Sequence, residues 1–155
     1  MSACGCAPSI PTPSRTLDTS SAAETAAIGA EVAAELRPGD VVLLHGEMGA
    51  GKTTFVRGAA RELGVTGAVT SPTFTIGRRY EDGRFPIAHV DLHRLSSLED
   101  EDPALLADYV NAEHVAFVEW PEVAGESLGA RVRVTLEHAG GDARRVTVAW
   151  AEGAP

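Results

Sequence analysis

The chain has 155 residues, enough for one domain with its own hydrophobic core. Its 13 basic and 22 acidic residues give a net charge of −9, so we do not expect unaided binding to a nucleic-acid backbone. Hydrophobic residues make up 44% of the sequence, and no apolar stretch approaches the roughly 20 residues of a membrane span. This composition predicts a globular protein without a membrane span.

The two ends of the chain are expected to lie outside the folded domain. Residues 1–14 are rich in proline, serine and threonine, which is typical of a disordered leader, and they lack the pattern of a secretory signal. Both cysteines, Cys4 and Cys6, lie there; they could form at most half of a metal site, and a mobile tail is the simpler interpretation. We expect a cytoplasmic protein with one domain over residues 15–150 and a tail over residues 151–155.

The first regular elements lead to a glycine-rich loop. Residues 21–24 have the spacing of a capping box, and an alanine-rich helix is expected to continue to Leu36. Residues 41–44 form an apolar run short enough for a buried strand, and residues 51–63 are typical of a helix that ends at Gly64. Strand, loop and helix follow in the order that a phosphate-binding loop requires.

The loop itself matches the complete phosphate-binding pattern G-x-x-x-x-G-K-[ST] over residues 46–53 and contains the only lysine of the chain, Lys52. Its glycines let backbone N–H groups approach phosphate oxygens, and the helix that starts there adds the positive end of its dipole. Lys52 is expected to contact the β and γ phosphates, the hydroxyl of Thr53 to bind magnesium, and Thr54 to support the α-phosphate side. The predicted nucleotide-binding residues here are Gly46, Glu47, Met48, Gly49, Ala50, Gly51, Lys52, Thr53 and Thr54.

Two later strands each end in a carboxylate. Four apolar residues precede Glu119, and residues 87–91 repeat the pattern more weakly and end in Asp91. Because ligands of parallel α/β sheets lie beyond the carboxyl ends of the strands, both acids are expected to face the nucleotide's magnesium. Glu119, Asp91 and Thr53 are therefore predicted metal ligands, and either acid could orient an attacking water. The alternative for each acid is a structural pair with a surface arginine.

The segment between the phosphate-binding helix and the chain's C-terminal part is less regular. Residues 73–76 favour a strand, and residues 99–102 are expected to form an acidic surface loop before a short helix over residues 103–109.

A hairpin pattern closes the domain. Residues 131–136 and 145–150 alternate polar and apolar side chains around a glycine-rich turn, which predicts two antiparallel strands. We therefore expect a three-layer α/β fold like that of P-loop NTPases. Its mixed sheet should have the phosphate-binding strand near the centre and the hairpin at one edge.

Four motifs follow one another in an order and spacing typical of one protein family. They are G-E-M-G-A-G-K-T-T at residues 46–54, T-S-P-T-F-T at residues 70–75, H-V-D-L-H-R-L at residues 89–95 and V-E-W-P-E at residues 118–122. Together they resemble the TsaE (YjeE) family of small bacterial P-loop ATPases, over roughly residues 17–137.

The resemblance implies ATP and Mg²⁺ as ligands and a role in the threonylcarbamoyladenosine modification of tRNA. It also implies action on a complex of TsaD and TsaB family proteins. Those partners transfer the threonylcarbamoyl group, while slow ATP hydrolysis by the family member resets or regulates them. Direct tRNA binding by this chain alone is not expected.

By residue, the resemblance implies that Lys52 clamps the phosphates, that Glu119 belongs to the magnesium site and that Asp91 is needed for hydrolysis. These three are the candidate catalytic residues. The resemblance also makes Ser71, Pro72 and Thr73 a switch-like segment near the γ-phosphate, and it places Trp120 at the nucleotide site or the partner surface.

The chain departs from the family pattern in two places. His93 stands where the family usually has tyrosine, and an imidazole titrates near neutral pH. Arg78 and Arg79 stand where an acid is common, and they are either solvated or sense phosphate. Two other functions are alternatives: a small-molecule kinase, or an adaptor gated by nucleotide without meaningful hydrolysis.

Overall fold

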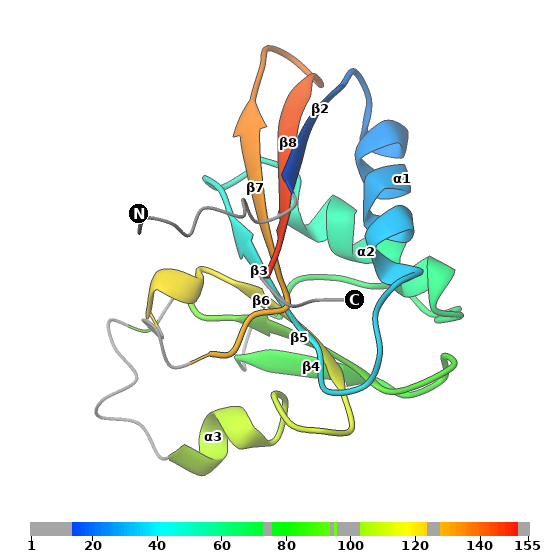
Figure 1. The fold of residues 1–155 in the computed structure, drawn as a ribbon, viewed down its shortest axis with the longest axis vertical. Coiled ribbons are helices and arrows are strands. Elements are labelled where there is room, and N and C mark those ends of the chain that lie inside the picture. The colour runs from blue at the N-terminus through cyan, green and yellow to red at the C-terminus, as the bar shows by residue number, and fades with distance from the viewer. Residues whose placement is uncertain (1–13, 73–75, 94, 96–102, 124–127, 152–155) are drawn as a thin grey trace, which may run out of the picture.

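The computed structural model describes residues 14–72, 76–93, 95, 103–123 and 128–151. In this part of the chain, seven strands form one mixed sheet in the order β2-β8-β7-β3-β6-β5-β4, and Figure 1 shows helices α1 and α2 side by side against it. The strands are β2 (Ser14–Thr19), β3 (Val41–His45), β4 (Gly77–Tyr80), β5 (Ile87–Asp91), β6 (Val115–Glu119), β7 (Val132–His138) and β8 (Arg144–Trp150). The helices are α1 (Ala22–Ala33), α2 (Lys52–Glu62) and α3 (Pro103–Ala107).

The centre of the sheet is parallel and its sides are antiparallel. Strands β7, β3, β6 and β5 run parallel to one another, whereas β8 pairs antiparallel with β7, β2 with β8, and β4 with β5. The predicted α/β class, mixed sheet and C-terminal hairpin are thereby confirmed. The parallel pairing also brings the carboxyl ends of β3, β6 and β5 to one edge of the sheet.

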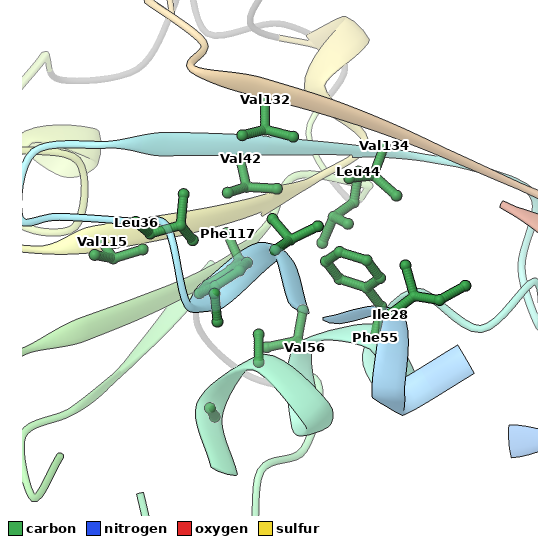
Figure 2. Close-up of a cluster of buried hydrophobic side chains, with 14 of the residues drawn as sticks. Ile28, Leu36, Val42, Leu44, Phe55, Val56, Val115, Phe117, Val132 and Val134 are labelled. Carbon is green, nitrogen blue, oxygen red and sulfur yellow. The ribbon is translucent and has the colours of Figure 1, made fainter. Parts of the chain in front are cut away.

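The central strands β3, β6 and β5 are buried on both faces, which agrees with their nearly continuous apolar sequences. On one face, Val42 and Leu44 of β3 pack with Phe117 of β6 against Phe55 of α2 and Ile28 of α1, as Figure 2 shows. On the other face, alternate residues of the same strands pack with side chains of the α3 region and its surroundings. The strand-ending residues are thus held by a core on either side.

Helices α1 and α2 cross at backbone contact. A Cβ atom added at Gly58 of α2 would lie 1.9 Å from the carbonyl oxygen of Ala26, and one at Gly29 of α1 would lie 2.2 Å from the carbonyl oxygen of Phe55. Glycine at both positions lets the two backbones approach in this way. Since α2 begins at Lys52, this crossing fixes where the glycine-rich loop ends.

The first helix starts as predicted and ends earlier. The side chain of Ser21 accepts a hydrogen bond from the Glu24 backbone N–H at 3.2 Å, and α1 ends at Ala33 rather than at Leu36. The residues that follow α1 form a tighter turn, in which the N–H of Leu36 donates to the carbonyl of Ala33 three residues earlier. The short helix α3 likewise ends at Ala107.

One edge of the sheet differs from the prediction. The hairpin does not form the edge, because β2 pairs along the outer side of β8 from Ser14 to Thr19. Segment 14–19 has a single large apolar residue, Leu17, so its sequence shows no strand periodicity. In the structure most of the segment is exposed. It covers hydrogen-bonding groups that β8 would otherwise leave open.

Two predicted segments fall partly or wholly outside the described residues. Of the predicted strand 73–76, only residue 76 is described, and the observed strand β4 begins at Gly77. The predicted acidic loop 99–102 is not described. Within the described residues, no helix has the length and hydropathy that crossing a membrane requires.

Candidate nucleotide site

The glycine-rich loop lies at the carboxyl end of β3, beside the ends of β6 and β5. In the parallel register Leu44 pairs with Glu119, and Glu119 pairs with Asp91, so the two acids sit on adjacent strands next to the loop. A pocket of about 420 Å³ opens at this point. It is lined by Met48, Gly49, Gly51, Lys52, Thr53, Thr54, Ser71, Pro72, Asp91, His93, Glu119 and Trp120.

Most of the predicted site residues therefore meet in one place. Among the described residues, the loop positions Gly46, Glu47 and Ala50 shape the loop without lining the pocket, and Thr73 lies outside the described residues. Arg78 and Arg79 lie on β4, where both are exposed, and neither lines the pocket.

The loop conformation depends on glycine. Gly46, Gly49 and Gly51 have φ angles of 155°, 81° and 104°. A Cβ atom at Gly46 would lie 2.7 Å from the carbonyl oxygen of Leu136 on β7. Gly51 is the N-cap of α2 and provides no side-chain cap, so the N–H groups of the first helical turn are available to a ligand. This is the arrangement that binds anions at helix N-termini.

Lys52 brings a buried positive charge to the pocket. The residue is 5% exposed, its Nζ donates a hydrogen bond of 2.6 Å to the carbonyl of Gly46, and the ammonium lies 4.1 Å from the centre of the Trp120 ring. Burial lowers the pKa of Lys52, while the charges of Glu119 and Asp91 oppose that shift. The ammonium is thus poorly hydrated, and its attraction for an anion is stronger than that of a fully hydrated charge.

Thr53 and Glu119 are connected through hydrogen bonds. The Thr53 hydroxyl lies 2.6 Å from the Ser71 hydroxyl and donates to Glu119 Oε2 at 3.4 Å. The same Oε2 lies 2.5 Å from Nε2 of His89, which is fully buried on β5. The imidazole therefore holds the Glu119 carboxylate in one orientation beside Thr53.

Asp91 is held by the histidine that follows it. The backbone N–H of His93 donates to Asp91 Oδ1 at 3.0 Å, and the ring Nδ1 of His93 lies 2.8 Å from the same oxygen. His93 also reaches the ring of Trp120, with ring centres 6.4 Å apart. The histidine that replaces the expected tyrosine therefore contacts Asp91 directly.

Trp120 has an unusual backbone. Its φ of 58° is the only positive value among the non-glycine residues that the structure describes, and such a conformation costs on the order of 1–2 kcal/mol. Strained backbone of this kind clusters at binding and catalytic sites. Here it places the indole over the Lys52 ammonium.

The donor set at the pocket suits Mg²⁺ held jointly with phosphate. Magnesium bound between phosphates takes one or two carboxylates or hydroxyls from the protein and completes its shell with phosphate oxygens and waters. Thr53, Glu119 and Asp91 offer such an incomplete set, and no group of three or more acidic, histidine or cysteine side chains forms a metal cage among the described residues. The residues present fit Mg²⁺ with a nucleotide better than Mg²⁺ alone.

One residue of the site had no assigned role from the sequence: His89, which lies 30 residues from Glu119 in the chain. A signal for His89 exists: it stands two residues before Asp91 on the same strand, and alternate residues of a strand share a face. Ser71 belongs to the segment that the resemblance places near the γ-phosphate, and it lines the pocket with its hydroxyl beside that of Thr53.

The fold and the site define an α/β protein in which a phosphate-binding-loop sequence joins a central parallel strand to a helix. The family model described as threonylcarbamoyl adenosine biosynthesis protein TsaE matches residues 19–146 of the chain. With this match and the relatives below, the chain belongs to the TsaE family.

The relatives cover most of the chain. The tRNA threonylcarbamoyladenosine biosynthesis protein TsaE of Bacillus subtilis (strain 168) is 44% identical over 126 residues, which are 80% of this chain and 78% of that protein. The protein of the same name from Streptomyces coelicolor is 46% identical over 129 residues, 78% of this chain and 86% of that protein. The crystal structure of YdiB from Bacillus subtilis superposes with a TM-score of 0.75 at 34% identity, covering 94% of this chain and 92% of that one.

Proposed function

We propose that this chain is a P-loop ATPase that binds ATP with Mg²⁺ and hydrolyses it slowly, as an accessory protein of tRNA threonylcarbamoyladenosine biosynthesis. The observation that carries the proposal is the convergence of Lys52, Thr53, Glu119 and Asp91 on one pocket beside the glycine-rich loop. Family membership supports the pathway, because the relatives are named as biosynthesis proteins of this modified nucleoside.

The proposal includes the fold type, the domain limits and the location. A mixed sheet with a phosphate-binding sequence after a central parallel strand supports a P-loop NTPase-like fold. The family match over residues 19–146 supports a single ATPase domain within residues 15–150, flanked by a leader and a short tail. A role in tRNA modification supports a cytoplasmic location.

The phosphate chain is bound by the loop and Lys52. The amides of the glycine-rich loop and of the first turn of α2 donate hydrogen bonds to phosphate oxygens. Lys52 exchanges its contact with the Gly46 carbonyl for the β and γ phosphates, where its poorly hydrated charge has most effect. Trp120 excludes water from the ammonium, and Thr54 supports the α-phosphate side.

Thr53 and Glu119 would hold the metal ion, and Asp91 would contribute a second carboxylate beside it. When bound, Mg²⁺ neutralises charge that develops on the phosphates during transfer. His89 donates to Glu119 and so keeps that carboxylate oriented toward Thr53. Thr73, as part of the segment after Ser71, is proposed to lie near the γ-phosphate.

Asp91 orients the attacking water. Both contacts from His93 go to its Oδ1, so Oδ2 can accept a hydrogen bond from a water molecule. A carboxylate held in this way positions the nucleophile, which is the main protein contribution to phosphoryl transfer.

Slow hydrolysis follows from the charges at the pocket. Among the described residues that line it, Lys52 is the single cation, so no arginine faces the phosphates there. An arginine supplied by a partner typically raises turnover by about 10³–10⁵ in such enzymes. We propose that a complex of TsaD and TsaB family proteins completes the site. Because the described residues that line the pocket include no arginine, a nucleotide-gated adaptor is the second candidate.

Two measurements test the proposal. Calorimetry with Mg·ATP should show binding to the full chain, and absence of binding to folded protein contradicts the proposal. Single-turnover hydrolysis, measured with and without the TsaD–TsaB complex, separates an ATPase from an adaptor. Hydrolysis that rises when the complex is added supports the ATPase, whereas nucleotide-dependent docking without hydrolysis supports the adaptor.

A further inference from the structure

Arg144, the first residue of β8, joins the hairpin turn to the glycine-rich loop. Its Nη2 donates to the carbonyl of Gly49 at 3.0 Å, and its Nε donates to the carbonyl of Ala50 at 3.2 Å. Its Nη1 donates to the carbonyls of Gly141 and Ala143 at 2.7 and 2.8 Å. One guanidinium therefore binds two carbonyls of the loop and two of the hairpin turn, which lie more than 90 residues apart in the sequence.

The loop has a specific need for such a contact. Gly49 and Gly51 have positive φ angles, and glycine loses more backbone freedom on ordering than any other residue. A loop built from these residues has many accessible conformations, and only one of them directs its N–H groups at a phosphate. A contact that fixes the loop before the nucleotide arrives removes that ordering cost from binding.

Arg144 can act as a fixed point because its own backbone is held on both sides. It pairs with Thr19 on β2 and with His138 on β7. Thr19 in turn lies 2.9 Å from the hydroxyl of Thr25 in α1, and both threonines are buried. The edge strand and the hairpin thus give the guanidinium a rigid base.

We propose that Arg144 is a positioning residue for nucleotide binding. It holds the carbonyls of Gly49 and Ala50, and so keeps the phosphate-binding loop in its receptive conformation. The inference deepens the proposed function and rests on it. Arg144 uses only carbonyl groups of the loop, so the contact leaves loop N–H groups to the phosphates.

The contacts distinguish this role from direct phosphate binding. An arginine has five N–H donors, and four of those of Arg144 are engaged with carbonyl groups. A lysine at this position would keep the charge, but its compact ammonium cannot reproduce a planar fork across four carbonyls. Substitution by lysine therefore separates positioning from charge.

The test uses R144Q, R144K and the control R145Q in the full chain. Arg145 is the adjacent arginine, and it forms an exposed pair with Asp18 at 3.1 Å. Each variant is measured for Mg·ATP affinity by calorimetry, and for amide hydrogen exchange over residues 47–52 without nucleotide. Thermal unfolding confirms that each variant folds.

We expect R144Q and R144K each to weaken Mg·ATP binding by at least about tenfold and to speed exchange in the loop, because several charge-assisted hydrogen bonds are lost. R145Q should stay within about twofold of the wild type, as exposed pairs contribute little. Should R144Q fail to fold, R144K keeps the charge and stem and gives the same test.

Two results overturn the inference. Wild-type affinity and wild-type loop exchange in both Arg144 variants would show that the contact positions nothing, and full affinity in R144K would show that charge alone matters. If the wild type itself does not bind Mg·ATP, the proposed function fails. The exchange rates then still report whether Arg144 fixes the loop.

Discussion

Replacing Gly58 by alanine should destabilise the protein, although the same change stabilises an ordinary helix. In a helix interior alanine is favoured over glycine by about 1 kcal/mol. Here the added Cβ would lie 1.9 Å from the carbonyl oxygen of Ala26 and 2.5 Å from its carbonyl carbon. Both neighbours are backbone atoms of α1, so no side-chain rotation relieves the clash.

The magnitude follows from the movement required. Real Cβ atoms essentially never approach other atoms within 3.0 Å, so α1 and α2 must separate by about 1 Å at this crossing. Overpacking typically costs about 1–3 kcal/mol, and a backbone-to-backbone clash belongs at or above the upper end. After the gain in helix propensity we expect a net loss of about 2 kcal/mol in the free energy of unfolding.

Urea unfolding followed by circular dichroism measures this loss. With a slope of about 1–3 kcal/mol per molar urea, the midpoint should fall by roughly 1 M. Gly67→Ala is the matched control, because nothing lies within 4 Å of a Cβ atom there, and its midpoint should stay the same or rise slightly. A Gly58→Ala variant as stable as the wild type would refute the reasoning, since the two helices would then have to tolerate the added methyl group.

Three further predictions concern the pocket. The pKa of Lys52 is lowered in the folded state, chiefly by burial. Between that lowered pKa and the ordinary value of 10.5, the unfolded chain binds more protons than the folded chain, so the contribution of Lys52 to stability rises with pH. The unfolding free energy of the wild type relative to Lys52→Met should therefore rise as the pH is raised toward 10.5, and a difference that falls with pH would contradict the lowered pKa. Asp91→Ala should abolish single-turnover hydrolysis while changing Mg·ATP affinity by less than about threefold, because Asp91 positions water rather than phosphate; normal hydrolysis would show that another group has this role. Glu119→Gln should raise the Mg²⁺ concentration needed for half-maximal ATP binding by about tenfold, measured by titration at fixed ATP, and an unchanged requirement would remove Glu119 from the metal site.

The glycine-rich loop and the strand-ending acids were predictable because their signals are local. Gly46, Gly51 and Lys52 lie within one short motif, and the apolar runs before Asp91 and Glu119 identify buried strands by composition alone. Parallel strands place their carboxyl ends at a common edge, so the convergence of these residues followed from a general rule of α/β sheets. The structure agrees, since the register pairs Asp91 with Glu119.

The sequence by itself determined the α/β class, the glycine-rich loop and the acids that face it, because each depends on neighbours in the chain. Only the tertiary structure decided that β2 forms the edge, that His89 orients Glu119 and that Arg144 reaches the loop. These features depend on contacts between residues 30 to 135 positions apart, whose pairing is set by strand register and helix crossing rather than by local periodicity.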